Sequence, residues 1–323
     1  MDSRPGGAGL KGCVIDKPAC ALFMEIMIPL RMLLAALAWV CVMTQPSSAI
    51  ILFGLGNSDN LTDPGTGVPF DGVAKVFTTD GGNTRGSAVH LGGGYMLTAN
   101  HVQVTTDQSF TFDGVVSYTL DAGFTPTQVA VGVDMKVFKL ATTPTVAAAS
   151  VYTGVGELVA PATLVGWGRG RLATVPNPVV TWGGAETIAK RWGLNVPKAA
   201  DVIEYSYAGF DYNYESIITV LGGPAADPAG LGANEAALTQ YDSGSGLFQY
   251  LGGQWYLTGI ATTVETNESS TFGDDDFDLA GGDLNFFARV GTYDSQILAL
   301  IPEPASGFLI MTGALLALRR RRH

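Results

Sequence analysis

The sequence predicts an all-β protein, and three observations lead to this class. Glycine makes up 42 of the 323 residues, well above its ordinary share of about 7%. Short runs rich in valine, threonine, tyrosine and phenylalanine lie between these glycines, as strands lie between tight turns. No long segment has helical periodicity, apart from residues 293–300. Many short strands with glycine-rich turns are typical of barrels and sandwiches.

The expected strands follow a surface arm at residues 50–72, which is rich in glycine, asparagine, aspartate and proline. Each strand is a short apolar or alternating run that ends at turn residues. The expected strands are 73–78, 87–91, 95–99, 109–112, 115–120, 129–133, 136–140, 157–165, 255–261 and 285–290. Residues 224–237 are rich in alanine, glycine and proline and are interpreted as a long loop.

The first 49 residues have the form of a secretory signal. Arg31 precedes twelve apolar residues at 32–43, and small residues follow at 47–49. This order predicts export and cleavage after Ala49. The alternative is a transmembrane helix, but twelve residues rise only about 18 Å, short of the roughly 30 Å hydrocarbon layer. We therefore expect a mature domain at 50–298, with two halves that meet near 150–160.

The last segment, 299–323, has a second processing signature. Pro-Glu-Pro at 302–304 precedes fourteen apolar residues at 305–318 and four arginines at 319–322. This tail resembles the PEP-CTERM sorting signal of Gram-negative bacteria. The resemblance implies transient inner-membrane contact through an apolar helix, cutting by an exosortase-type enzyme, and a place in the cell envelope or extracellular matrix. Independently, the arginines should stay on the cytoplasmic side. The alternative is a permanent C-terminal anchor.

Removal of both segments would leave an acidic domain without cysteine. Residues 50–300 contain ten Lys and Arg against 25 Asp and Glu, a net charge of 10 − 25 = −15. Such a surface repels phosphate backbones, which excludes nucleic acid as a partner. Cys13, Cys20 and Cys41 all precede the expected cleavage site. The mature domain therefore has no disulfide, no thiol nucleophile and no cysteine-based zinc site.

Histidine is rare, which narrows the search for a catalytic base. The chain has His90, His101 and His323, and His323 lies in the tail that sorting would remove. His90 lies within an expected strand, where a histidine is more often a structural residue. His101 ends the run Met-Leu-Thr-Ala-Asn-His at 96–101. An apolar strand ends there and a polar segment begins, so His101 is the candidate base, and a structural histidine at a strand end is the alternative.

Two further motifs supply a carboxylate and a hydroxyl. Asp134 begins the run Asp-Met-Lys-Val-Phe-Lys-Leu, and Ser243 lies in Tyr-Asp-Ser-Gly-Ser-Gly-Leu-Phe. A carboxylate at a strand start can accept a hydrogen bond from an imidazole Nδ1–H. Glycines beside Ser243 let the backbone turn sharply and expose the hydroxyl. Taken alone, the first motif is equally explained by a turn aspartate and the second by a polar turn.

Together these motifs resemble those of trypsin/chymotrypsin-like serine peptidases, in the same order of His, Asp and Ser. Gly-Trp-Gly at 166–168 and the run at 285–290 resemble further segments of that family. The resemblance implies two antiparallel six-stranded β-barrels with a short C-terminal helix. It also implies that Ser243 is the nucleophile, His101 the general base and Asp134 the orienting carboxylate. The implied substrate is a peptide or protein, and no metal or organic cofactor is required.

The resemblance extends to the oxyanion hole and the specificity pocket. It assigns the oxyanion-binding amides to Tyr241 and Ser243, but the family has glycine where this chain has Tyr241, and a tyrosine opposes a positive φ. An active endopeptidase and a catalytically silent surface-binding or matrix protein therefore both remain as functions. Ala237 stands where trypsins carry the aspartate that selects Arg or Lys. With Thr262, it predicts a pocket for a small or apolar residue.

Cleavage after Ala49 would create a new amino terminus at Ile50. In the resembling family, a freed apolar N-terminus can insert beside the aspartate that precedes the catalytic serine, which here is Asp242. A buried carboxylate needs a partner because an unpaired charge in a low dielectric is costly. Ile50 is therefore the expected partner of Asp242, and an internal arginine, such as Arg289, is the alternative.

Overall fold

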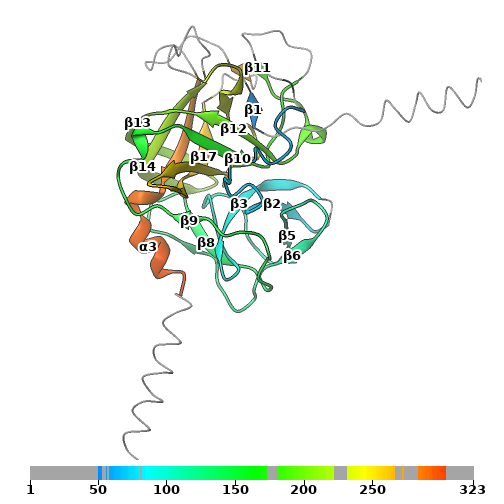
Figure 1. The fold of residues 1–323 in the computed structure, drawn as a ribbon. Coiled ribbons are helices and arrows are strands. Elements are labelled where there is room, and N and C mark those ends of the chain that lie inside the picture. The colour runs from blue at the N-terminus through cyan, green and yellow to red at the C-terminus, as the bar shows by residue number, and fades with distance from the viewer. Residues whose placement is uncertain are drawn as a thin grey trace, which may run out of the picture. The chain divides into compact units, whose positions relative to one another are not determined.

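The computed structural model describes residues 50–52, 56, 58–80, 82–172, 180–221, 231–265, 271–272 and 283–302 (Figure 1). The predicted signal at 1–49 and the apolar part of the predicted sorting segment lie outside the described residues. Among the residues described, no helix is long and apolar enough to cross a membrane. The described chain is mostly β-sheet with very little helix, as the sequence predicts.

The first half of the domain forms an antiparallel sheet of seven strands in the order β6-β5-β2-β3-β4-β8-β7. These strands are β2 (Val73–Thr78), β3 (Thr84–Gly92), β4 (Tyr95–Thr98), β5 (Gln108–Thr111), β6 (Ser117–Thr119), β7 (Thr127–Gln128) and β8 (Lys136–Lys139). An isolated antiparallel bridge joins Leu120 to Leu140, just beyond β6 and β8. The sheet therefore curls back toward itself.

The second half forms a sheet of eight strands, in which seven follow the order β12-β10-β16-β17-β19-β14-β13. They are β10 (Ala162–Gly166), β12 (Arg191–Asn195), β13 (Pro197–Tyr207), β14 (Phe210–Leu221), β16 (Gly246–Leu251), β17 (Gln254–Val264) and β19 (Asp283–Arg289). The eighth, β9 (Ser150–Val151), pairs in parallel with β17. The Asn195 side chain donates to the Val220 carbonyl at 2.9 Å, which links β12 to β14.

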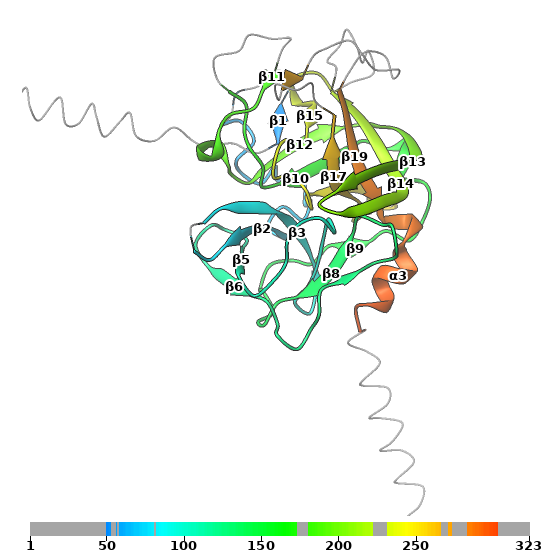
Figure 2. The same ribbon diagram turned by 180° about the vertical axis from the view of Figure 1, so that it is seen from behind.

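Two small ribbons and short helices complete the described chain. The ribbons pair β1 (Ile51–Leu52) with β15 (Ala236–Ala237), and β11 (Val180–Thr181) with β18 (Thr271–Phe272). The helix α3 (Asp294–Ala299) follows β19, and 3-10 turns lie at Glu157–Val159, Ala185–Thr187, Gly232–Asn234 and Val290–Thr292. Figure 2 shows the two sheets stacked one above the other, with α3 beside them.

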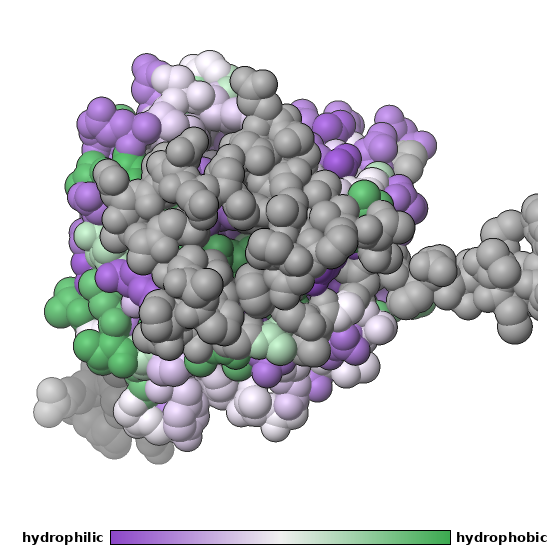
Figure 3. All heavy atoms as spheres, turned by 90° about the horizontal axis from the view of Figure 1, so that it is seen from above, coloured by the Kyte–Doolittle hydropathy of each residue, from purple (hydrophilic) through white to green (hydrophobic). Residues whose placement is uncertain are grey.

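A continuous apolar core joins the two sheets. One buried cluster contains Val89 and Phe138 from the first sheet together with Val165 and Ile260 from the second. Burial of each such side chain contributes about 1.5–3 kcal/mol, so the sheets stabilise each other. On the outside, hydrophilic and hydrophobic side chains are interspersed over the described surface of the face in Figure 3, as on an ordinary solvent-facing surface.

The structure departs from the predicted strands in several places. Glu157–Val159, at the start of the strand predicted at 157–165, form a 3-10 turn; β12 and β16 were not predicted; and β15 lies in the loop predicted at 224–237. The sheets have seven and eight strands among the described residues, where two sets of six were expected. Residues 129–133 form bends and a turn, so the strand predicted there is wrong. The long hairpin of β13 and β14 was not predicted at all. Aromatic or apolar residues alternate with polar ones along both strands, at 203, 205 and 207 and at 210, 212 and 214. This period of two is typical of a strand, so the signal for the hairpin was present in the sequence.

Candidate active site

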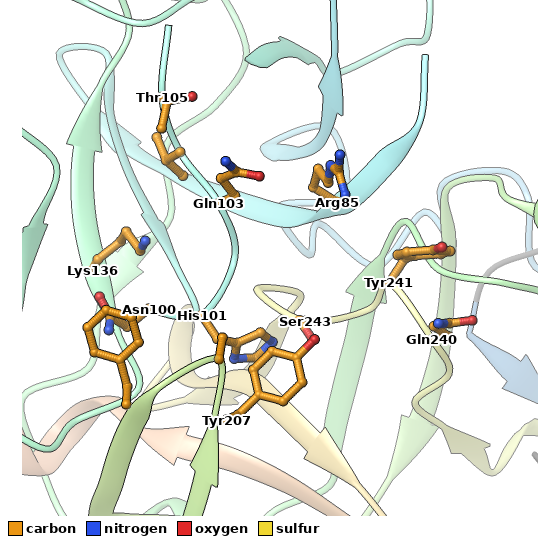
Figure 4. Close-up of a pocket in the computed structure, with 13 residues that line it drawn as sticks. Arg85, Asn100, His101, Gln103, Thr105, Lys136, Tyr207, Gln240, Tyr241 and Ser243 are labelled. Carbon is orange, nitrogen blue, oxygen red and sulfur yellow. The ribbon is translucent and has the colours of Figure 1, made fainter. Parts of the chain in front are cut away.

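A cleft of about 550 Å³ is lined by both His101 and Ser243 (Figure 4). Residues of the first sheet, including Arg85 of β3 and Lys136 of β8, form part of its lining. The tip of the β13–β14 hairpin and residues 240–243 supply the rest of its second-sheet side. The cleft therefore brings together segments that lie far apart in the sequence.

Strand pairing brings His101 and Asp134 together. β4 and β8 are antiparallel neighbours with Thr98 opposite Lys136, so the residues that follow β4 lie beside those that precede β8. His101 Nδ1 lies 2.6 Å from one Asp134 oxygen, and the His101 backbone N–H donates to the other at 2.9 Å. Asp134 is fully buried. This geometry can fix the imidazole tautomer and stabilise a protonated ring.

The β13–β14 hairpin contributes tyrosines to this pair that sequence reasoning missed. The Tyr205 hydroxyl donates to Asp134, and burial together with the Asp134 charge raises the pKa of Tyr205, so the hydroxyl keeps its proton. The Tyr207 ring meets the His101 ring edge-on, with centroids 5.3 Å apart. Alternate tyrosines at 205 and 207, followed by Ala208-Gly209 with positive φ, are a hairpin signal that could have found these residues.

Replacing Tyr205 by phenylalanine is expected to lower kcat about tenfold with little change in KM. A hydrogen bond to a charged group contributes roughly 1.5 kcal/mol, and Tyr205 acts through Asp134 rather than on substrate. Steady-state kinetics with a peptide substrate measures both constants. Tyr250→Phe is the matched control, because Tyr250 lies exposed on β16. A fall in KM alone, or an equal loss in the control, would exclude Tyr205 as a positioning residue.

Ser243 lies in the same cleft but is not hydrogen-bonded to His101. Its Oγ donates instead to the Thr262 carbonyl, at a long distance of 3.4 Å. Serine side chains exchange between staggered rotamers, and catalytic hydrogen bonds of unbound enzymes often tighten only when substrate binds. The structure thus joins His101 to Asp134 by a hydrogen bond, and Ser243 lines the same cleft as His101.

The backbone of Ser243 is held by the first sheet. The Ser87 N–H in β3 donates to the Ser243 carbonyl at 2.7 Å. Gly244 has φ +87°, and a Cβ there would lie 2.0 Å from the Ser87 carbonyl oxygen, so only glycine fits. Ser245 points elsewhere: it is buried, and its Oγ bonds to Ser87 Oγ at 3.2 Å and to Asp242 at 3.4 Å. Ser243 is therefore the serine that faces the cleft.

The expected conflict at Tyr241 is present in the structure. Tyr241 has φ +78°, a conformation that costs a bulky residue about 1–3 kcal/mol. The Arg169 guanidinium lies over its ring, 5.3 Å from the centroid, and this cation–π contact offsets part of the cost. The Arg169 N–H donates to the Gln240 carbonyl at 3.0 Å. Because a trans peptide points its C=O and N–H in opposite directions, the Tyr241 N–H faces away from Arg169.

Two backbone donors are therefore available near the Ser243 hydroxyl. Within the described part of the chain, neither the Tyr241 N–H nor the Ser243 N–H donates to another backbone or side-chain group. Backbone N–H groups without partners beside a nucleophile are the means by which an oxyanion is stabilised. Their assignment as the oxyanion donors stays a prediction.

Tyr241→Gly is expected to keep kcat within about threefold and to raise the unfolding free energy by about 1 kcal/mol, since glycine takes a positive φ without steric cost. Tyr241→Ala is the matched control, because it also removes the ring but keeps the strained Cβ. Denaturant unfolding and peptide kinetics of both variants measure the effects. An alanine variant as stable as the glycine variant would show that the backbone at position 241 is not strained.

The two predicted pocket residues are buried outside the described cleft lining. Ala237 lies in β15, where it packs with Ile51 and Leu221. Thr262 lies in β17, and its hydroxyl donates to the Phe286 carbonyl at 3.0 Å. Their role in specificity stays a prediction.

Asp242 is completely buried next to the nucleophile. The Thr239 N–H and hydroxyl donate to its carboxylate at 2.8 and 2.9 Å, and the Ile50 backbone N–H donates as well. Burial nevertheless raises the pKa of Asp242 to about 7. The carboxylate presses against Gly168, where a Cβ would lie 2.4 Å from it, which explains why the Gly-Trp-Gly run ends in glycine.

Arg289, the alternative partner expected for Asp242, binds elsewhere. Its guanidinium pairs with Glu157 and Glu215, so Arg289 is not the internal arginine near Asp242. A different cation, Arg191, is the one near Asp242: burial lowers its pKa to about 9, and the Asp242 charge opposes that shift.

Comparison with known proteins finds no matching protein-family model and no matching curated protein. Similar solved structures include the HtrA-type protease AlgW with decapeptide, at 15% identity and a TM-score of 0.44. The match covers 72% of this chain and 65% of AlgW, so this chain spans about two thirds of that protein's length. The active form of the Rv3671c protease from M. tuberculosis is 11% identical with a TM-score of 0.48, covering 81% and 93%. Its inactive form is 12% identical with a TM-score of 0.45, covering 72% and 91%. Similarities of this degree carry no argument about activity, so function is argued from the cleft itself.

Proposed function

We propose that this chain is an exported serine endopeptidase with a chymotrypsin-like arrangement of two β-barrels. The observation that carries the proposal is the buried His101–Asp134 pair in the same cleft as Ser243. Two backbone N–H groups beside Ser243 remain free among the described residues. A nucleophile, a base, an orienting carboxylate and oxyanion donors together favour acyl transfer.

In the proposed reaction, substrate binding turns the Ser243 hydroxyl from the Thr262 carbonyl toward His101, a change of one side-chain rotamer. Ser243 Oγ then attacks the peptide carbonyl while His101 takes its proton. The Tyr241 and Ser243 N–H groups stabilise the oxyanion. His101 returns the proton to the leaving amine, and water hydrolyses the acyl-enzyme by the same steps. No group outside the chain takes part.

The proposal includes the specificity pocket and the processing of both chain ends that the sequence predicts. Ala237 and Thr262 would form a pocket for a small or apolar side chain. Cleavage after Ala49 and sorting at 299–323 would place the mature enzyme in the cell envelope or extracellular matrix, after contact with the inner membrane and an exosortase-type enzyme. Mass spectrometry of the protein isolated from its native host would test both ends of the mature chain.

A catalytically silent surface-binding or matrix protein is the second candidate. Two observations favour it: the Ser243 hydroxyl bonds to Thr262 instead of His101, and Tyr241 occupies a strained position in the oxyanion loop. A fluorophosphonate probe, which labels only an activated serine, separates the two functions. We expect stoichiometric labelling of the chain that begins at Ile50. Absence of labelling and of peptide hydrolysis would establish the silent alternative.

A further inference from the structure

The charge of the cleft is opposite to that of the domain. Among the 13 residues that line it, Arg85 and Lys136 are cationic and none is aspartate or glutamate. Residues 50–300 as a whole carry 25 acidic and ten basic side chains. A random sample of this domain would therefore contain more carboxylates than cations. The cleft lining is therefore positively charged within an acidic domain, and an acidic ligand would complement its charge.

Both cleft cations are without partners. Within the described residues, neither Arg85 nor Lys136 forms an ion pair or a hydrogen bond through its side chain. Lys139 of the same strand, by contrast, pairs with Asp121 at 3.2 Å, and Arg289 pairs with two glutamates. Arg85 is exposed and so open to a ligand, whereas Lys136 is partly removed from water, where an unpaired cation is costly. A ligand carboxylate would supply the missing partner.

Lys136 is half-buried, and burial lowers its pKa to about 8, against an opposing effect of the Asp134 charge. It is therefore still mostly protonated at pH 7. Asp134 itself is fully buried and saturated by His101 and Tyr205. It does not present a negative surface to the cleft.

Each cation lies two residues along the chain from a residue of the proposed site, Arg85 within β3 and Lys136 at the first residue of β8. Arg85 precedes Ser87, whose N–H holds the Ser243 carbonyl, and Lys136 follows Asp134. Two residues of a strand span about 7 Å, which is also the span of two residues of an extended peptide substrate. Figure 4 shows Lys136 and Arg85 to either side of Gln103, with His101, Ser243 and Tyr207 grouped below them.

We propose that the cleft selects peptides with aspartate or glutamate within about three residues of the cleaved bond, with Arg85 and Lys136 as the specificity-determining residues. This inference rests on the proposed peptidase function. The domain's overall negative charge favours basic peptides at long range, but screening limits that effect to about 8 Å at physiological ionic strength. At contact distance, the charges of Arg85 and Lys136 determine whether the cleft prefers acidic or basic peptides.

Three quenched fluorescent peptide sets test the inference, with the same apolar residue before the cleaved bond and glutamate, glutamine or lysine around it. We expect kcat/KM to fall in that order, with about tenfold between the glutamate and glutamine sets. Arg85→Gln and Lys136→Gln should each lower the glutamate-to-glutamine ratio about three- to fivefold, the size of a solvent-exposed ion pair. Arg85→Glu should shift the preference toward the lysine set.

Lys139→Gln is the matched control, because it removes a charge from the same strand outside the cleft and should leave the ratio unchanged. A ratio that no cleft variant alters, or fastest cleavage of the lysine set by the unaltered protein, would overturn the inference. Failure to cleave any set would instead overturn the proposed function. Fluorescence anisotropy with Ser243→Ala then decides charge preference separately: tighter binding of the glutamate set, lost on adding Arg85→Glu, supports it, and equal binding of the glutamate and lysine sets overturns it.

Discussion

Ser243→Ala is expected to abolish fluorophosphonate labelling and to lower kcat at least about 10⁴-fold, the loss typical of removing the nucleophile of a serine peptidase. The same change should cost little stability. The Ser243 hydroxyl is half-buried and makes one hydrogen bond, of 3.4 Å, to the Thr262 carbonyl. Peptide kinetics and thermal unfolding of the purified variant measure the two effects.

Ser245→Ala should behave in the opposite way and is the matched control. Its hydroxyl is buried between Ser87 and Asp242, so its removal should cost about 1 kcal/mol of stability and leave substantial activity. A pair of variants that lose labelling equally would show that the wrong serine has been assigned.

A matched pair of variants also distinguishes the two histidines of the domain, His90 and His101. His90 is buried in β3, with its ring edge-on to Phe112 at a centroid distance of 6.2 Å, and burial lowers its pKa. His90→Gln should therefore affect stability more than catalysis. Loss of activity in His90→Gln, together with an active His101→Ala, would reverse the assignment of the base.

A chain that begins one or two residues before Ile50 is expected to be several hundredfold less active than one that begins at Ile50. In the longer chain, Ile50 has φ +42°, a conformation that is a genuine outlier for a β-branched residue. Cleavage of the 49–50 bond removes the carbonyl that this angle involves, and so removes the strain. It also replaces a neutral N–H beside Asp242 with an ammonium group.

The pH dependence of stability supplies an independent measurement of this step. In the longer chain, burial raises the pKa of Asp242 to about 7. A raised pKa stabilises the fold below the unfolded value of about 3.9, and this contribution is lost as pH rises through about 7. An ammonium partner favours the ionised carboxylate, so the chain that begins at Ile50 should not lose stability over this range.

The comparison of activity and the comparison of pH-dependent stability both need accurately defined amino termini. A removable fusion partner provides them. Ile50→Val in the shorter chain is the control, because valine keeps an apolar residue and a free amine at the same place. Equal kcat/KM and equal pH profiles for the shorter and longer chains would exclude activation through Ile50.

The sequence predicted the parts of the site that depend on a few neighbouring residues. His101 and Asp134 follow and precede short apolar strands that pair with each other, so local patterns were sufficient to find them. Tyr205 could not be found in the same way. It reaches Asp134 from the β13–β14 hairpin. The alternation of that hairpin indicates strands, but only tertiary packing decides which residue its tyrosines contact.

The two partners of Asp242 also differ in how far the sequence could predict them. Its proximity to Ile50 was expected from the resemblance, and the structure places the Ile50 N–H on its carboxylate. An internal arginine was the expected alternative, but Arg191 was not singled out, because nothing in its local sequence indicates a buried cation. The all-β class was predicted correctly from composition. The distribution of strands was not, since it depends on which segments pair across long separations.

The attachment of the nucleophile loop to β3 has a consequence for the order in which the chain acquires activity. Ser245 and Ser87 are 158 residues apart, and their contact, like that between Ser87 and Ser243, forms only after both sheets have folded and docked. Contacts of such long sequence separation form late because loop closure must precede them. For the proposed exported peptidase, this order means that a partly folded chain lacks a competent Ser243 while its own peptide bonds are most exposed, which would protect the protein from digesting itself.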